Sequence, residues 1–223
     1  MKFFEQLNLS KQHRQKMMDY FNELLEANKY INLTSIIDKE EAVQKHFIDS
    51  LKAIDFLEGN ILDIGTGAGF PSIPLAIIKE SLNFTLIDSV QKKLQFIKTV
   101  CEKLDIKNVT TLHSRIEDLP KTIKYDTVLT RGVGALNIVC EYALPFMKLG
   151  GQLIAYKGKN YEEEIEIAKN ALEILGGKIE KIEKYDLFIK GEKFERALII
   201  IKKIKECEEK YPRGKNKPRL QPL

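Results

Sequence analysis

Three glycines at alternate positions are the first residues of this 223-residue chain whose spacing suggests a ligand site. Gly65, Gly67 and Gly69 follow the short apolar run Ile61–Ile64, which is typical of a buried parallel strand. Pro71 then begins an apolar helix. Glycine lets a ligand approach the bare backbone, and the free N–H groups of a helix start favour an anionic group. The stretch therefore predicts the first turn of a nucleotide-binding βαβ unit.

The glycine spacing is G-x-G-x-G, which differs from the G-x-G-x-x-G of dinucleotide-binding domains. With Asp63 two residues before Gly65, it resembles the first motif of S-adenosylmethionine (AdoMet) methyltransferases. A tight turn in another α/β protein is the alternative, and the glycines alone leave it open. The ends of the later strands must decide between the two.

In a doubly wound sheet the ligand lies across the carboxyl ends of the strands. The second predicted strand ends at Asp88, nineteen residues beyond Gly69, where a carboxylate can accept hydrogen bonds from both ribose hydroxyls. The alternative for Asp88 is a helix N-cap, since a helix follows, and both roles can hold together. After the third strand, Ile116 would cover the adenine face and Glu117 would accept from its amino group. A solvated loop is the alternative there.

Two cations follow the fourth and fifth predicted strands. Arg131 would point toward the methionine carboxylate or an incoming phosphate, unless it pairs with the buried Asp63. Lys157 would be a second cation at the rim of the same cleft.

Strand and helix patterns alternate from residue 60 onward and must position these side chains. Strands are predicted at 61–64, 83–88, 109–113, 125–130, 152–156, 178–187 and 196–202, and helices at 73–78, 91–104, 135–147 and 161–175. The last two strands have no helix between them and predict an antiparallel hairpin. The fold class is therefore α/β, a doubly wound, Rossmann-like sheet of five βα units with a terminal antiparallel hairpin. Nicotinamide-binding domains usually lack that hairpin.

Residues 1–59 predict an N-terminal helical extension, followed by a methyltransferase-like domain over 60–209 and a basic tail over 210–223. Ser10 should cap the first helix, and further helical pieces are predicted near 40–47 and 51–57. Within this region His46 and Asp49 are three residues apart. A metal pair is conceivable, but the chain has only three histidines, so we favour a local hydrogen bond or helix cap.

Composition narrows the class of protein. The chain is 43% hydrophobic and 30% charged, which suits one soluble domain with an elaboration. We see neither a run of membrane-spanning length nor a secretory leader. The three cysteines are odd in number and far apart, which favours a reducing cytoplasm and argues against a disulfide framework or a structural zinc.

The tail accounts for the basic charge of the chain. It carries five lysines and arginines and no acid, so the rest of a chain of net charge +4 has a net charge of −1. Its three prolines oppose regular structure, and we expect it to be extended and mobile. It is either a solubilising terminus or an arm whose Arg213, Lys215, Lys217 and Arg219 contact a polyanion. We expect cofactor binding, which uses earlier residues, to be nearly independent of it.

Several elements spread over nearly the whole chain occur together in one known family. They are Asn32-Leu33-Thr34-Ser35, His46 with Asp49-Ser50, Asp63-x-Gly-x-Gly-x-Gly-Phe70-Pro71, Leu86-x-Asp88-Ser89, Ser114-Arg115-x-Glu117, Lys157-Gly158, and the tail from Tyr211-Pro212-Arg213 to Pro222-Leu223. With them the chain resembles the bacterial 16S ribosomal RNA guanine-N7-methyltransferases (RsmG, also called GidB). The glycine loop extended by Phe70-Pro71 is far more specific than the glycines alone.

The resemblance implies AdoMet as methyl donor and N7 of guanine 527 in 16S rRNA as target, within the small ribosomal subunit or an assembly intermediate. It places five residues at AdoMet-contacting positions: Gly65, Phe70, Ile116, Glu117 and Arg131. With Gly67, Gly69 and Asp88 they make the expected cofactor site, and Lys157 and the tail cations are the expected RNA contacts. We expect a cytoplasmic monomer without a metal. The family usually shows Arg-Ala after the fourth strand, and Arg131-Gly132 here should loosen the backbone.

The implied chemistry agrees with what the chain lacks. Guanine N7 has a free lone pair, so methylation there needs neither a cysteine nucleophile nor a strong general base, and alignment supplies much of the acceleration. No catalytic base is assigned, and Arg131 is expected to position substrate or methionine. Two other classes stay open: a nicotinamide-dependent oxidoreductase, disfavoured by the glycine spacing and the hairpin, and a non-catalytic RNA-binding or ribosome-assembly module.

Overall fold

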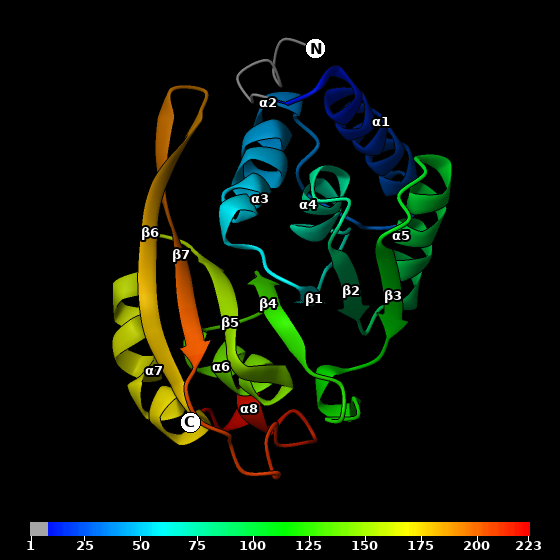
Figure 1. The fold of residues 1–223 in the computed structure, drawn as a ribbon. Coiled ribbons are helices and arrows are strands. Elements are labelled where there is room, and N and C mark those ends of the chain that lie inside the picture. Colours follow the sequence, from blue (N-terminus) through cyan, green and yellow to red (C-terminus); the bar gives the residue numbers. More distant parts are fainter. Residues whose placement is uncertain (1–8) are drawn as a thin grey trace.

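The computed structural model describes residues 9–223, in which one seven-stranded sheet lies between two layers of helices (Figure 1). The strand order is β3-β2-β1-β4-β5-β7-β6. The strands are β1 (Asn60–Ile64), β2 (Asn83–Asp88), β3 (Val109–His113), β4 (Tyr125–Arg131), β5 (Met147–Lys157), β6 (Gly177–Ile189) and β7 (Glu192–Lys203). The first five are parallel, and β7 runs antiparallel to both β5 and β6. The predicted doubly wound sheet with a terminal hairpin is therefore confirmed.

Both faces of the sheet are covered, which explains why β1 is apolar on both sides. The two helical layers are α1 (Lys11–Asn28), α4 (Ser72–Ile78) and α5 (Gln91–Lys103) on one face, and α6 (Leu136–Ala143) and α7 (Tyr161–Leu175) on the other. Side chains alternate along a strand, so Ile61 packs in the first core and Leu62 and Ile64 in the second. Both cores lie directly beneath the carboxyl ends of the parallel strands.

The N-terminal helices belong to the first core. Ser10 caps α1 as predicted, since its Oγ accepts from His13 N at 3.1 Å. The two further pieces predicted near 40–47 and 51–57 are instead one continuous run followed by a short turn. The run comprises α2 (Lys39–Ala42), the π-helical turn Val43–Ile48 and α3 (Asp49–Leu51), and the 3-10 turn is Ile54–Phe56. Among residues 9–223, no helix combines the length and the apolarity needed to cross a lipid bilayer.

The third βα unit differs from the prediction, because the β3–β4 connection holds only the 3-10 turn Ile116–Asp118. Eleven residues separate the two strands, and the connection must pass β2 and β1 before it reaches the far side of β1. Strands lie about 4.8 Å apart, so a chain of this length has little left to form a helix. The turn is thereby kept at the carboxyl end of the sheet.

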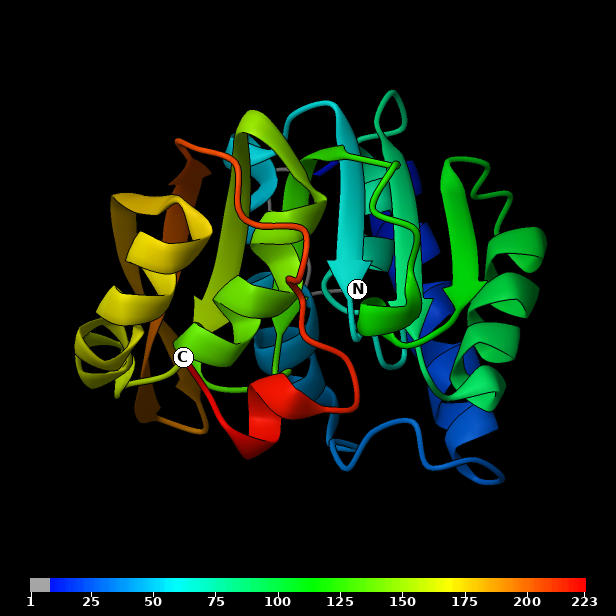
Figure 2. The same ribbon diagram turned by 90° about the horizontal axis from the view of Figure 1, so that it is seen from below.

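The predicted extended, mobile tail is wrong. Residues 210–223 pack along α6, where Tyr211 is only 5% exposed, and Figure 2 shows the tail lying across that helix. The segment contains α8 (Lys217–Leu220), and Leu223 O accepts from Asn137 Nδ2 at 3.2 Å. Prolines exclude a long helix, but they permit a chain that is fixed by contacts with its neighbours.

Candidate functional site

Two adjoining cavities open at the carboxyl ends of the parallel strands, where ligands of such sheets lie. The first, called here the strand-end cavity, has a volume of about 490 Å³, within the usual range for ligand sites. It is lined by Ile64, Gly65, Ile87, Asp88, Ser89, Val90, Lys93, Ser114, Arg115, Ile116, Glu117, Gly132, Val133, Tyr142, Asn216 and Arg219. The structure therefore brings together four of the predicted cofactor residues: Gly65, Asp88, Ile116 and Glu117.

The second, called here the Arg131 cavity, has a volume of about 370 Å³. It is lined by Ile36, Lys45, His46, Asp49, Arg131, Gly132, Gly134, Tyr156, Lys157, Gly158, Glu164 and Arg196. Gly132 lines both cavities, so they meet at the β4–α6 loop, residues 132–135. Its φ of +68° suits glycine, which is the residue that departs from the usual alanine of the family.

The three glycines of the loop have different roles. All have positive φ, of 71° at Gly65, 61° at Gly67 and 103° at Gly69, where other residues are strained. A Cβ at Gly69 would lie 2.6 Å from Ile73 Cγ1 and 2.9 Å from Tyr20 Oη, so glycine is needed there for packing. A Cβ at Gly67 would meet no described atom within 4 Å. No described atom therefore obstructs a side chain at Gly67, and within the protein only the φ of this residue disfavours a substitution.

Asp88 joins the glycine loop to the start of α5. Its Oδ2 accepts from Gly67 N at 3.0 Å and its Oδ1 accepts from Val90 N at 2.9 Å. Each carboxylate oxygen has a second lone pair, so the side chain can still accept from ribose hydroxyls. Asp88 is not the N-cap of α5, which is Val90 and has no side-chain cap, and its two hydrogen bonds are compatible with the proposed ribose contact.

Phe70 lies outside the strand-end cavity, as part of the aromatic core under the glycine loop. Its ring centroid is 5.2 Å from that of Tyr20, 5.5 Å from that of Phe47 and 4.5 Å from that of His46, which stacks on it. The guanidinium carbon of Arg131 lies 5.3 Å from the Phe70 centroid. The side chain therefore supports the loop and the Arg131 cavity from below.

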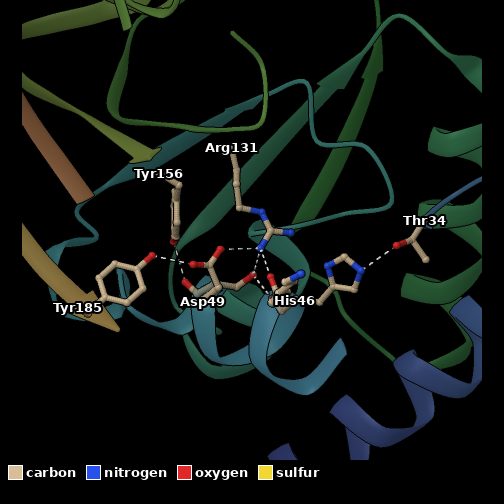
Figure 3. A network of polar contacts seen from close by, with 8 residues as sticks. Thr34, His46, Asp49, Arg131, Tyr156 and Tyr185 are labelled. Carbon is tan, nitrogen blue, oxygen red and sulfur yellow. Dashed lines mark hydrogen bonds and ion pairs between the residues drawn. The ribbon is translucent and has the colours of Figure 1, made fainter. Parts of the chain in front are cut away.

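Arg131 is held by the helical run that precedes the sheet (Figure 3). Its Nη1 donates to Lys45 O at 2.9 Å, to Asp49 Oδ2 at 3.0 Å and to Ser50 Oγ at 3.4 Å. Tyr185 Oη, from β6, donates to Asp49 Oδ1 at 2.7 Å. Sequence reasoning considered Asp63 as the partner of Arg131, whereas the ion pair is with Asp49. Arg131 thus lines the second cavity and is separated from the predicted cofactor residues that line the strand-end cavity.

His46 is kept neutral beside Arg131. Its Nε2 is hydrogen-bonded to Thr34 Oγ1 at 2.8 Å, which agrees with the favoured local hydrogen bond (Figure 3). Burial lowers the pKa of His46 to about 3, and the positive charges of Arg131 and Lys45 add to the shift. In residues 9–223, no three side chains of the metal-binding types gather into a metal site.

Asp63, which sequence reasoning considered as part of the motif and as a partner for Arg131, is the least satisfied polar side chain near the loop. It is 1% exposed, and neither carboxylate oxygen has a well-aligned partner among the described residues. The hydroxyls of Thr66 and Ser72 are likewise buried without one. Burial raises the pKa of Asp63 to about 7, against the opposing effects of Ser72, Thr66 and Arg131. The sequence signal that could have singled out Asp63 is the presence of an acidic residue within an otherwise apolar strand.

The cations predicted to contact RNA fall into two groups. Lys157 is only 7% exposed, and its Nζ donates to Gly134 O at 2.7 Å and to Glu164 Oε2 at 2.6 Å, so it is a buried partner and not a rim cation. Arg213 and Arg219 bond to the protein itself. Lys215 and Lys217 are exposed.

Sequence reasoning missed Arg196, the cation of β7 that lines the Arg131 cavity. Its buried Nε has no hydrogen-bond partner within the described chain. No pattern in the neighbouring sequence points to Arg196, because a hairpin strand reaches this cavity only through the packing of β6 and β7 against the helical run. Arg115 and Lys93, which line the strand-end cavity, were also missed as individual contacts.

Comparisons with known proteins agree on one family. The family model described as "rRNA small subunit methyltransferase G" (GidB) matches residues 13–199. The "Ribosomal RNA small subunit methyltransferase G" of Clostridium beijerinckii is 43% identical over 215 residues, which cover 93% of this chain and 89% of that protein. The protein of the same description from Lactobacillus acidophilus is 41% identical over 225 residues, which cover 96% and 93%.

Two solved structures share the fold at low identity. M. jannaschii TYW2 in complex with AdoMet has a TM-score of 0.58 at 18% identity and covers 76% of this chain and 80% of that one. The precorrin-6y C5,15-methyltransferase of Geobacter metallireducens has a TM-score of 0.52 at 18% identity, with coverage of 76% and 92%. At this identity they establish the fold alone.

Proposed function

Because the chain belongs to the rRNA small subunit methyltransferase G family, we propose that it transfers a methyl group from AdoMet to N7 of guanine 527 in 16S rRNA. The observation that carries the proposal is the pair of cavities that meet at Gly132. The strand-end cavity takes the cofactor and the Arg131 cavity takes the target base. A methyl group can then pass between them at the β4–α6 loop.

The residues of the strand-end cavity fit AdoMet. Asp88 has free lone pairs for the ribose hydroxyls, and Ile116 and Glu117 lie where an adenine ring needs an apolar face and an acceptor. A Cβ at Gly65 would stand 3.0 Å from Val133 Cγ2, so glycine there keeps open the gap between the two loops. When bound, AdoMet supplies an electrophilic methyl group on a positively charged sulfur.

The Arg131 cavity suits a base that is methylated without losing a proton first. Asp49 is occupied by Arg131 and Tyr185, and His46 is occupied by Thr34, so neither is arranged as a free general base. The guanidinium of Arg196, whose side chain lines this cavity, is a donor for a guanine oxygen or a phosphate. Orientation of the base by these groups therefore accounts for the chemistry better than proton transfer.

The proposal also covers the form of the substrate, the location of the enzyme and its oligomeric state. The substrate is 16S rRNA in the small subunit or an assembly intermediate, and the enzyme is a cytoplasmic monomer. Of the predicted RNA contacts, Lys215 and Lys217 are the two exposed cations whose side chains form neither a hydrogen bond nor an ion pair among residues 9–223. They lie on the same tail that borders the strand-end cavity, close to where the RNA must enter.

Methyl transfer from labelled AdoMet tests the proposal, with naked 16S rRNA and with small subunits that lack this methylation as substrates. The expected result is one labelled guanine, mapped to position 527 and cleavable by the chemistry specific to 7-methylguanine. Transfer to another base or another atom would overturn the assignment of the target. Binding of AdoMet and RNA without any transfer would instead support the non-catalytic ribosome-assembly module.

A further inference from the structure

The C-terminal tail forms a wall of the strand-end cavity. Asn216 and Arg219 line it, together with side chains that lie more than seventy residues earlier in the chain. Glu117 and Tyr142 also line this cavity, and the charges of Glu117 and Arg219 both act on Tyr142. The tail therefore lies next to the residues expected to hold adenine.

A buried ion pair anchors this wall. Glu141 of α6 is 1% exposed, and two guanidinium nitrogens of Arg213 bond to its carboxylate. Nε donates to Oε1 at 2.8 Å and Nη2 donates to Oε2 at 2.6 Å. The Arg213 backbone N also donates to Oε1 at 2.9 Å. Arg213 Nη2 donates further to Gln221 O at 2.8 Å, which ties the two ends of the tail together. A bidentate pair with a buried carboxylate holds a segment in one place and orientation.

Arg219 in turn holds the loop that separates the two cavities. Its Nη2 donates to Val133 O at 2.7 Å. On the other side of the loop, Lys157 Nζ donates to Gly134 O, and Glu164 Oε2 accepts from Leu136 N at 2.8 Å. Gly132 directly precedes Val133 at the start of this loop, and a Cβ at Gly132 would meet no described atom within 4 Å, so a side chain there would gain no packing contact.

We infer that the tail is a cofactor-positioning element, in which Arg213 locks the segment to α6 and Arg219 holds the β4–α6 loop in the shape that binds AdoMet. The inference rests on the proposed AdoMet site. It reverses the expectation that cofactor binding is nearly independent of the tail. Since coupling between two sites is reciprocal, bound AdoMet must also stabilise the docked tail.

Calorimetric titration with AdoMet tests whether the tail supports cofactor binding. Arg219→Ala should weaken binding by about five- to tenfold, because the loop loses a charged donor, and Arg219→Lys should recover part of the loss. A chain that ends at Lys215 keeps the Arg213–Glu141 anchor but lacks Asn216 and Arg219, so it should fold and bind at least as weakly as Arg219→Ala. The matched control is Lys210→Ala, since Lys210 is a tail cation that pairs, within residues 9–223, only with Glu208 and Tyr211, outside the cavity.

Tryptic cleavage within the tail of the full chain tests whether bound AdoMet stabilises the docked tail. Cleavage after the exposed Lys215 should slow by the same factor at saturating AdoMet, whereas NAD should have no effect. Equal AdoMet affinity in the full chain, Arg219→Ala and the chain ending at Lys215 would overturn the inference, as would an equal loss in Lys210→Ala. Failure of the full chain to bind AdoMet would instead defeat the proposed function.

Discussion

The two cavities that meet at Gly132 differ in how far their polar groups are already satisfied. In the strand-end cavity Asp88 keeps free lone pairs, while Arg115 and Glu117 form no ion pair within residues 9–223. In the Arg131 cavity two ion pairs join lining residues to each other, Arg131 with Asp49 and Lys157 with Glu164. The polar groups of the first cavity are thus free to contact a ligand, whereas those four residues of the second hold one another in place.

This difference predicts two kinds of mutational effect. Removal of a side chain from the strand-end cavity removes a ligand contact and should lower affinity more than stability. Removal of a side chain from the Arg131 cavity leaves its partner charged, buried and unpaired, and should lower stability as well as activity.

The largest effect is expected for Asp49→Ala. The change strands the guanidinium of Arg131 and the hydroxyl of Tyr185, and should lower the free energy of unfolding by about 3–5 kcal/mol. Arg131→Lys keeps the charge but loses the planar fork, so it should reduce methyl transfer at least tenfold with a much smaller loss of stability. Urea unfolding and a transfer assay measure the two quantities.

The exposed Glu166→Ala, on helix α7, whose only ion pair is with Lys169 in the described chain, is the control for Asp49→Ala and should be nearly neutral. A loss below about 1 kcal/mol in Asp49→Ala would show that Arg131 and Asp49 do not hold each other in place. Full transfer activity in Arg131→Lys would make Arg131 a structural residue only.

In the strand-end cavity, Asp88→Ala should cost about 1–3 kcal/mol of AdoMet binding, because it removes ribose contacts and frees Gly67 N. Asp88→Asn, which keeps one acceptor, should lose less. Glu117→Ala should cost less than Asp88→Ala, since water can replace it at the adenine amino group. Calorimetry measures all three, and parental affinity in both alanine variants would remove these residues from the cofactor site.

Four residues of the strand-end cavity could be predicted from the sequence, because each one ends or follows a strand that the local sequence pattern reveals. Strand ends in a parallel sheet converge, so Gly65, Asp88 and Glu117 could be placed together from the strand pattern alone. The strand at 83–88 and the helix at 161–175 coincide with β2 and α7. Membership in the AdoMet-dependent rRNA methyltransferase family, which the resemblance implied, is confirmed by the comparisons.

The Arg131 cavity and the tail could not be predicted in the same way. The partner of Arg131 comes from a helical run about eighty residues earlier, and its position depends on how that run packs on β4 and β6. Glu141 lies within an apolar helix pattern, and only the fold reveals that it faces Arg213. By contrast, the missing helix between β3 and β4 was open to prediction, since the connection is short.

The pH dependence of stability should separate the two cavities by sign. The pKa of Asp63, beneath the glycine loop, is raised from 3.8 to about 7, so its contribution to stability is full below pH 3.8 and is lost as the pH rises toward 7. The pKa of His46, in the Arg131 cavity, is lowered from 6.5 to about 3, so its contribution is full above pH 6.5 and is lost as the pH falls. Between these values the two effects oppose each other.

Asp63→Asn should therefore make the free energy of unfolding rise with pH between 4 and 6.5, relative to the parent, by at most about 1.4 kcal/mol per unit. His46→Gln, which can still bond to Thr34, should make it fall by a similar amount over the same range. Urea unfolding at three pH values, without AdoMet, measures both slopes. Parental slopes in both variants would show that neither group titrates differently in the folded chain.

The smallest effect is expected from the exposed face of the tail. Each phosphate contact contributes about 0.7–0.9 to the slope of log affinity against log salt. An extended tail with five engaged cations would give a slope of roughly 3–4, but Arg213 and Arg219 already bond to Glu141 and Val133. The double variant Lys215→Ala, Lys217→Ala should thus flatten the slope by only about 1.4–1.8 and leave AdoMet affinity unchanged. A salt series of RNA binding decides: an unchanged slope in the double variant would place the RNA elsewhere, and a flattening near roughly 3–4 in a chain that ends at Glu209 would mean that the tail leaves α6 to meet the RNA.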